Sequence, residues 1–179
     1  MTEPWNLIDV WPAKNASASL AERRPPASPE AVGRTEERLG FEIPADLCES
    51  LLCHDGDDVY LAVLPFGPLY STERIVEIRT MRMRIWDADD PEQRDAPWWG
   101  ARWAPFAGRD GDEHFIDAGP GLWHNHLGRA AQDDSATPPA GRAWPPWLHA
   151  VAQAMPHHGG RDHVEPAKSP IRFCVKVVD

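Results

Sequence analysis

Several histidines stand close together in the sequence, and their side chains are of the type that binds metal ions. His124 and His126 flank Asn125, and residues two apart on a strand would place both imidazoles on one face. No further ligands follow at a defined spacing, so we expect surface histidines here and no metal. The same holds for the polar segment 157–163, HHGGRDH, which could hold a metal weakly in vitro. The letters H-N-H also occur in a nuclease motif, but that motif needs distant histidines and a zinc-knuckle-like frame.

A second arrangement could provide a general base. His54 is followed by Asp55, which could orient it, but no serine or cysteine stands in a glycine-flanked nucleophile elbow. Cys53 neighbours His54 in a predicted helix, where adjacent residues point apart. We interpret His54-Asp55 as a helix end followed by a turn. Phosphate-binding patterns GxGxxG and GxxxxGK[ST] are absent from the sequence, so we expect a protein without catalytic residues or a cofactor.

Carboxylates form the remaining pattern. The chain has 28 acidic and 18 basic residues, a formal net charge of −10, which argues against nucleic-acid binding and suits a basic protein partner. The segment 108–114, GRDGDEH, lacks the spacing of a calcium loop and predicts a hairpin turn. Acidic loops are also common simply for solubility, and this alternative stays open. The predicted partner-binding residues, an acidic and aromatic patch, are Asp57, Asp58, Asp89, Asp90, Trp98, Trp99, Asp110, Asp112 and Glu113.

The composition suits one ordinary domain. The chain has 179 residues, of which 42% are hydrophobic and 26% charged. Its 19 prolines favour a loop-rich α+β architecture over a helix bundle. Three cysteines, Cys48, Cys53 and Cys174, form no CxxC pair. No basic segment followed by an apolar run opens the chain, and no stretch is long and apolar enough for a membrane span, so we expect a cytoplasmic protein without membrane contact.

Helix signals dominate the first half of the chain. Residues 5–11 predict a short helix, and 12–27 a tether. Ser28, Pro29 and Glu30 begin a helix that Gly40 ends, and a second helix follows Pro44. Ser71 can cap a further helix to about Trp86. Ile75, Ile78, Arg82 and Ile85 fall on one side of this helix.

Strand signals dominate the second half. The apolar run 58–67 predicts a buried strand, and 101–119 predicts two strands joined by a tight turn. A helix over 147–155 and a half-buried strand over 171–179 follow. We therefore expect an N-terminal short helix and tether (1–27), an α+β domain (28–155), and a linker with a C-terminal strand packed on that domain (156–179).

Two separated segments resemble the Smi1/Knr4 (SUKH) family. In EERLGFEIPADLCESLLCHDG (36–56), the matching residues are Glu37-Arg38-Leu39-Gly40, Ile43-Pro44, Leu47, Leu51 and Asp55-Gly56. In WAPFAGRDGDEHFID (103–117), they are Trp103, Pro105, Phe106, Gly108, Gly111 and Asp117. Between them, LPFGPLYS (64–71) is similar to the middle of the domain. The resemblance covers about residues 28–150. The stretch after Asp117 matches the family only loosely, and the strand over 171–179 lies outside its pattern.

The resemblance implies a single α+β domain with a central, mostly antiparallel sheet and flanking helices. Bacterial relatives are largely immunity proteins that bind and neutralise toxins, and fungal relatives are regulatory interaction hubs in cell-wall signalling. Neither group carries a catalytic site, so the matching residues are expected to build the fold. We expect an immunity protein for a basic toxin domain. The alternatives are an endogenous regulatory scaffold and a metal-dependent enzyme using His124 and His126. The sequence carries no signal for an oligomeric state.

Overall fold

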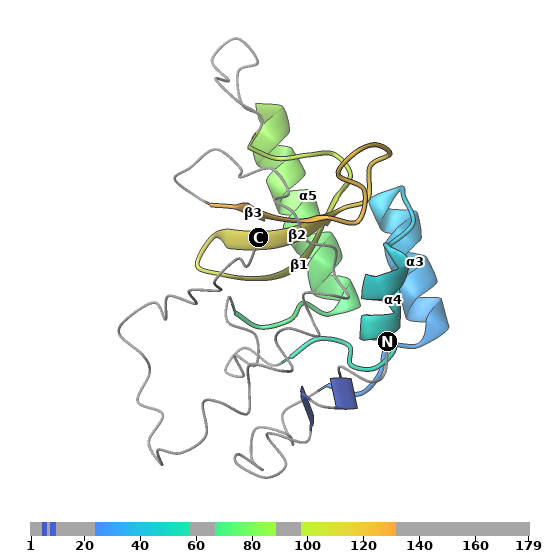
Figure 1. The fold of residues 1–179 in the computed structure, drawn as a ribbon. Helices are drawn as coiled ribbons and strands as arrows, with labels where there is room; N and C mark the ends of the chain where they lie inside the picture. Colours follow the sequence, from blue (N-terminus) through green and yellow to red (C-terminus); the bar gives the residue numbers. More distant parts are fainter. Residues whose placement is uncertain (1–4, 7, 10–23, 58–66, 89–97, 132–179) are drawn as a thin grey trace, which may run out of the picture.

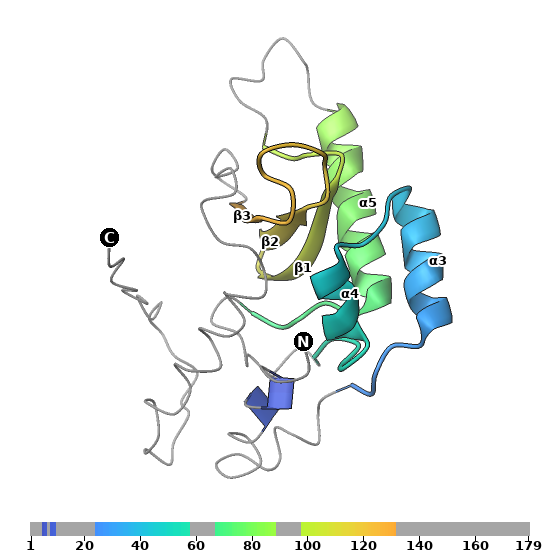
Figure 2. The ribbon, with the colours of Figure 1, turned by 45° about the vertical axis from the view of Figure 1, so that its right-hand side comes forward.

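The computed structural model describes residues 5–6, 8–9, 24–57, 67–88 and 98–131 of the chain (Figure 1). Their named elements are α3 (Pro29–Leu39), α4 (Ala45–Leu51), α5 (Thr72–Ala88), β1 (Trp103–Arg109), β2 (Asp112–Asp117) and β3 (Leu127–Ala130). The strands form an antiparallel sheet in the order β1-β2-β3, and α5 packs against both β1 and α3. Figure 2 shows the sheet, α5 and α3 side by side. The predicted α+β fold is confirmed.

Local signals place α3 where the sequence predicts it. The Ser28 hydroxyl accepts a hydrogen bond from the Ala31 amide, and Pro29 occupies the first turn. Gly40 ends the helix in the left-handed conformation, with φ 77°, which glycine adopts without a side-chain clash. The face turned to the core carries Val32, Thr35 and Leu39.

The β1–β2 hairpin also follows its sequence signal. Asp110 and Gly111 both have positive φ, 54° and 91°, as the two-residue turns that match the twist of a hairpin require. The turn joins Arg109 to Asp112, which face each other across the strands. The predicted strand-turn-strand over 101–119 is confirmed.

Two apolar clusters stabilise these elements. The larger one joins α3, α4, α5, β1 and β2, and it also contains Trp5 and Ile8 from the start of the chain. The smaller one gathers Trp99, Phe115 and Ala130, with Trp103 stacked on Phe115 at 3.8 Å between ring centroids. Burial at this scale is the main favourable contribution to folding.

Some predicted elements differ from the structure or lie outside the described residues. The sequence places Ile85 on the same side of α5 as Ile75 and Ile78, and it is 48% exposed whereas those two are buried. The last turns of α5 extend past the strands in both ribbon views (Figures 1 and 2). Residues 58–66, the helix over 147–155, the strand over 171–179 and Cys174 lie outside the described residues. Among the described helices, none is long and apolar enough to cross a bilayer.

The turn after α4 holds the start of α5. One oxygen of the Asp55 carboxylate accepts a hydrogen bond from the Thr72 amide at 2.7 Å, and the other accepts from the Thr72 hydroxyl at 3.3 Å. Ser71 provides a second cap by accepting from the Arg74 amide. Gly56, with φ 83°, lies so close to the Ser71 backbone that a Cβ would overlap it. The matching Asp-Gly of the resemblance therefore joins two helices.

Replacing Asp55 by alanine should lower the free energy of unfolding by about 1–2 kcal/mol, because the first turn of α5 loses an acceptor for its amide. Urea unfolding followed by circular dichroism measures the change. Glu37→Ala, an exposed charge on α3, is the control and should change it by less than about 0.5 kcal/mol. Equal effects of the two substitutions would contradict the capping role of Asp55.

His114 on β2 is a partly buried titratable group. It lies opposite Arg129 on β3, and its ring is 6.3 Å from that of Phe106. Burial, and secondarily the positive charge of Arg129, lower the pKa of His114 to about 4. The folded protein therefore keeps this imidazole neutral at a pH where the unfolded chain already binds a proton.

Stability should consequently fall as the pH drops from about 6.5 to about 4, since only the unfolded state gains the proton in that window. The contribution of His114 corresponds to about 2–3 kcal/mol over this range. Urea unfolding at several pH values measures it, and His114→Gln should flatten the profile relative to wild type. An unchanged profile in His114→Gln would contradict the assignment.

Candidate functional site

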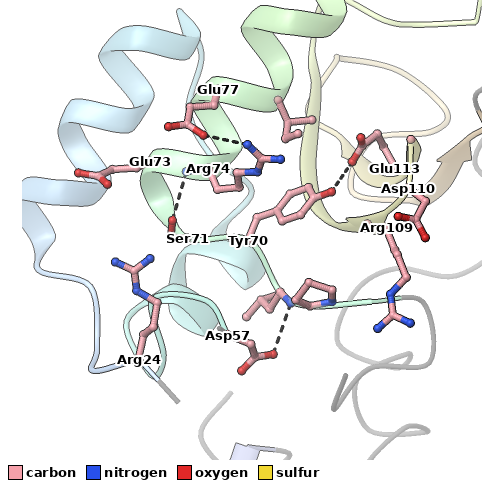
Figure 3. A pocket seen from close by; sticks show the side chains of 15 residues that line it. Arg24, Asp57, Tyr70, Ser71, Glu73, Arg74, Glu77, Arg109, Asp110 and Glu113 are labelled. Atoms are coloured by element: carbon pink, nitrogen blue, oxygen red, sulfur yellow. Dashed lines mark hydrogen bonds and ion pairs between the residues drawn. The ribbon is translucent and has the colours of Figure 1, made fainter. Parts of the chain in front are cut away.

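A cleft of about 410 Å³ lies where the start of α5 meets the turn of the β1–β2 hairpin (Figure 3). Four parts of the chain line it: Arg24, Asp57, the segment 68–71 with the first two turns of α5 that follow it, and the hairpin residues 108–111 with Glu113. These parts are far apart in the sequence, so the cleft exists only in the folded chain.

The inner wall of the cleft is built on a buried hydrogen bond. The Tyr70 hydroxyl donates to Oε2 of Glu113 at 2.5 Å (Figure 3). Burial, together with this bond to a carboxylate, raises the pKa of Tyr70 far above its usual value. The hydroxyl therefore stays protonated at physiological pH and acts as a donor within the fold.

Arg82 compensates the charge of Glu113. Its Nη2 donates to Oε1 of Glu113 at 3.0 Å and also to the carbonyl of Gly111, and its guanidinium lies 5.9 Å from the Trp99 ring centroid. The Arg82 and Glu113 side chains are only 7% and 4% exposed. A buried pair gains little net stability, because both charges lose water, but neither partner is tolerated there without the other. The pair thus fixes α5 against the hairpin.

Gly108 allows this close approach. A Cβ at this position would overlap the Tyr70 hydroxyl, the Glu113 carboxylate and the Asp112 carbonyl. Only a residue without a side chain fits, so the glycine serves the packing of the cleft wall.

The rim of the cleft carries charges of both signs. Arg74 pairs with Glu77 at 3.0 Å, and both side chains are more than half exposed. Arg74 also lies over the Tyr70 ring, 5.9 Å from its centroid. The other charged residues that line the cleft are Arg24, Asp57, Glu73, Arg109 and Asp110, besides the buried Glu113. Arginines therefore line the same cleft as the carboxylates.

The predicted partner-binding carboxylates reach this region in part. Asp57 and Asp110 both line the cleft. Asp110 is exposed at the hairpin turn, while Asp57 accepts a weak hydrogen bond from the Leu69 amide at 3.4 Å. Asp112 does not line the cleft; it accepts from Nη2 of Arg129 at 2.6 Å, with both side chains about half exposed.

Two predicted residues are interior. Glu113 is 3% exposed and bound to Arg82, so it does not project from the hairpin as expected. Trp99 is 2% exposed, because it packs edge-on against Trp103 and Phe115 in the smaller cluster. Neither is available as an exposed contact residue.

The remaining members of the predicted set do not join the cleft. Trp98 is half-buried and contacts the Trp86 ring edge-on, with centroids 5.6 Å apart, near the C-terminal end of α5. The tryptophans thus lie away from the start of α5, where Asp57 and Asp110 line the cleft. Asp58, Asp89 and Asp90 lie outside the described residues.

His124 and His126 belong to no metal-binding group in the described part of the chain, and the segment 157–163 lies outside the described residues. His124 and His126 lie at the end of a loop, where each uses its Nδ1 for a backbone carbonyl, of Gly119 and of His124 respectively. Nowhere in the described ranges do three or more His, Cys, Asp or Glu side chains form a group that could hold a metal ion.

The possible base, His54, has another partner, and the possible nucleophiles, Cys48 and Cys53, lie in surroundings that disfavour the thiolate. Nε2 of His54 lies 3.0 Å from the Asp9 carboxylate, whereas Asp55 caps α5. Burial raises the pKa of the Cys48 and Cys53 thiols, which disfavours the reactive thiolate at neutral pH. The interpretation of His54-Asp55 as a helix end and turn is confirmed.

Of the residues that build the cleft wall, sequence reasoning singled out Glu113, as an exposed residue, and missed the two that bind it, Tyr70 and Arg82. Tyr70 belongs to no sequence motif that would have marked it as a buried hydrogen-bond donor. Arg82 was placed on the apolar side of α5, and an arginine among isoleucines is a usable signal, because a buried guanidinium requires a buried acceptor. The exposed arginines of the rim, Arg24, Arg74 and Arg109, carried no signal beyond their charge.

A comparison with protein families finds one match. The model of the SMI1 / KNR4 family (SUKH-1) matches residues 26–129, more than half of the 179 residues. The matched range contains α3, α4, α5, β1, β2 and nearly all of β3, together with the residues that carried the resemblance. No curated protein matches the chain.

The two arginine–glutamate pairs at the cleft offer a matched comparison, since both have an N–O distance of 3.0 Å. Arg82→Met should lower the free energy of unfolding by about 3–5 kcal/mol, because it leaves the Glu113 carboxylate buried without its countercharge. Arg74→Met, in the exposed pair with Glu77, should cost less than about 1 kcal/mol. Chemical denaturation of each variant measures the difference.

A double-mutant cycle then isolates the pair energy. Arg82→Met combined with Glu113→Gln should be less destabilised than the sum of the two single variants by about 2 kcal/mol. The cycle of Arg74→Met with Glu77→Gln should show a coupling of about 0.5 kcal/mol or less. Additive effects at Arg82 and Glu113 would show that the buried pair does not act as a unit.

Proposed function

Since the chain belongs to the SMI1/KNR4 family (SUKH-1), we propose that it is a non-catalytic protein-binding module that serves as an immunity protein. It binds a cognate bacterial toxin directly and covers the toxin's active or substrate-binding surface. The observation that carries this proposal is that the cleft has buried, paired charges in its wall and exposed charges on its rim. The wall is locked by the buried Arg82–Glu113 pair, whereas rim residues such as Glu73, Arg109 and Asp110 are exposed.

This division suits recognition of a protein. A rigid wall lowers the entropic cost of binding, and exposed charges around it set the orientation and identity of the partner. The net charge of −10 favours approach of a basic toxin domain, and this attraction weakens with salt. The arginines on the rim fit carboxylates that accompany the basic residues of such a domain.

The contact surface that we propose is centred on Asp57 and Asp110 and extends to Asp112. Asp58, Asp89, Asp90 and Trp98 remain proposed members of a wider acidic and aromatic surface. The proposed site of action is the cytoplasm, where the chain would meet the incoming toxin.

The first experiment is affinity capture with the full chain from a lysate of its native organism, at low and moderate salt, with mass spectrometry. The expected result is one basic, toxin-like protein whose recovery falls as salt rises. Recovery of several endogenous signalling or envelope proteins without a toxin domain would contradict the immunity function and favour a regulatory scaffold.

The cleft is tested with the captured toxin domain and paired charge variants. Glu73→Gln with Asp110→Asn removes two exposed charges from the rim, and asparagine tolerates the positive φ of position 110. Asp57 is kept because it accepts the Leu69 amide. Binding at low salt should weaken by about tenfold or more, since the lost charges contact the partner directly. Calorimetry or surface plasmon resonance measures the affinity.

The control variant, Glu37→Gln with Glu42→Gln, changes the net charge equally at exposed positions outside the cleft. It should weaken binding by less than about threefold, through long-range attraction alone. Equal losses of affinity in both variants would show that the cleft is not part of the interface, and would not contradict the immunity function. Reversing Asp89, Asp90, Asp110 and Asp112 together tests the wider acidic surface, and unchanged affinity at low salt would refute charge-guided binding.

A further inference from the structure

Residues near the start of the chain pack against the domain through specific side-chain contacts. Residues 5–6 and 8–9 are helical, and Trp5 and Ile8, three positions apart, are 2% and 0% exposed within the larger apolar cluster. The indole Nε1 of Trp5 donates to Oγ of Ser50 at 2.7 Å. Trp5 and Ile8 are thus the residues through which the apolar side of this short helical stretch packs on the domain.

His54 completes the contact. Its ring meets the Trp5 indole edge-on, with centroids 5.3 Å apart, and its Nε2 lies 3.0 Å from Oδ2 of Asp9. Ser50 and His54 belong to the last turn of α4 and the residues just after it. We call this place, defined by Ser50 and His54, the α4 docking site. Both ribbon views place the N-terminal helical residues near this end of α4 (Figures 1 and 2).

The occupant comes from outside the family domain. The family match begins at residue 26, yet Trp5 and Ile8 fill part of the core that the matched residues form. A helix this short is not stable in water by itself, so its conformation depends on the docking site. The domain thus binds a short helix that the rest of its chain delivers at high effective concentration.

We propose that the α4 docking site is a binding site for short helices and that the stretch carrying Trp5, Ile8 and Asp9 is its tethered occupant. The ligand is a helix that carries tryptophan, an aliphatic residue three positions later and a carboxylate at the next position, as in Trp5, Ile8 and Asp9. A partner protein that presents such a helix displaces the N-terminal segment. This site is separate from the cleft and does not depend on the toxin partner.

The test uses a fluorescein-labelled peptide of residues 1–12 and the full-length chain. Wild-type chain binds the peptide weakly, because its own segment competes for the site. The Trp5→Ala chain, which has lost its main anchor, should bind the peptide at least about tenfold more tightly in fluorescence polarisation. A peptide with the same Trp5→Ala change should not bind, and an Asn6→Ala chain, changed at an exposed position, should behave as wild type.

Two measurements keep the outcome decisive. Circular dichroism and amide exchange over 24–131 verify that the Trp5→Ala chain is folded. Asp9→Ala, which removes the partly exposed contact to His54, should raise peptide binding by a smaller factor. If Trp5→Ala unfolds the chain and Asp9→Ala gives no gain, the segment is a permanent part of the core and the proposal is wrong.

Other results also decide the matter. Equal peptide affinity for wild-type and Trp5→Ala chains would place the peptide elsewhere, and no binding to a folded Trp5→Ala chain would remove the site. Sedimentation of wild type as a dimer, with Trp5→Ala a monomer, would assign the site to a second copy of this chain and overturn the partner helix.

Discussion

The rest of the structure depends on one buried carboxylate, that of Glu113. It accepts hydrogen bonds from the Tyr70 hydroxyl and from Arg82, and a charge removed from water at this depth is tolerated only if both donors are in place. Those donors come from the segment before α5 and from α5 itself, while Glu113 belongs to the hairpin. Satisfying one group therefore positions three parts of the chain, and the shape of the cleft follows.

The charges of the protein have two separate roles. Inside, Arg82 and Glu113 neutralise each other and determine geometry; outside, the rim of the cleft offers exposed residues of both signs. Exposed charges contribute little to folding, so they can vary without loss of the scaffold. The residues that match the family, such as Asp55, Gly56 and Gly108, have structural roles here, and the proposed recognition surface is the exposed rim that they support.

The core is not confined to the part of the chain that matches the family. Trp5 and Ile8 are as deeply buried as residues of α4 and β1, although they precede the matched range. The interactions that hold them, an indole hydrogen bond to Ser50 and a histidine–carboxylate contact, are those of ligand recognition as much as of folding. One domain can thereby combine a charged cleft with a separate place for an apolar helix.

The sequence by itself determined the features that rest on neighbouring residues. Ser28 and Gly40 mark the two ends of α3, and Asp110-Gly111 form the hairpin turn, because capping and positive φ are local requirements. The separated motifs identify the family. The tertiary structure alone decided which predicted contact residues remain exposed. Glu113 is buried against Arg82 and Tyr70, which are distant in sequence. Ile85 is 48% exposed although Ile75 and Ile78, on the same side of α5, are buried. Burial depends on what packs against a residue across the fold, and no local pattern contains that information.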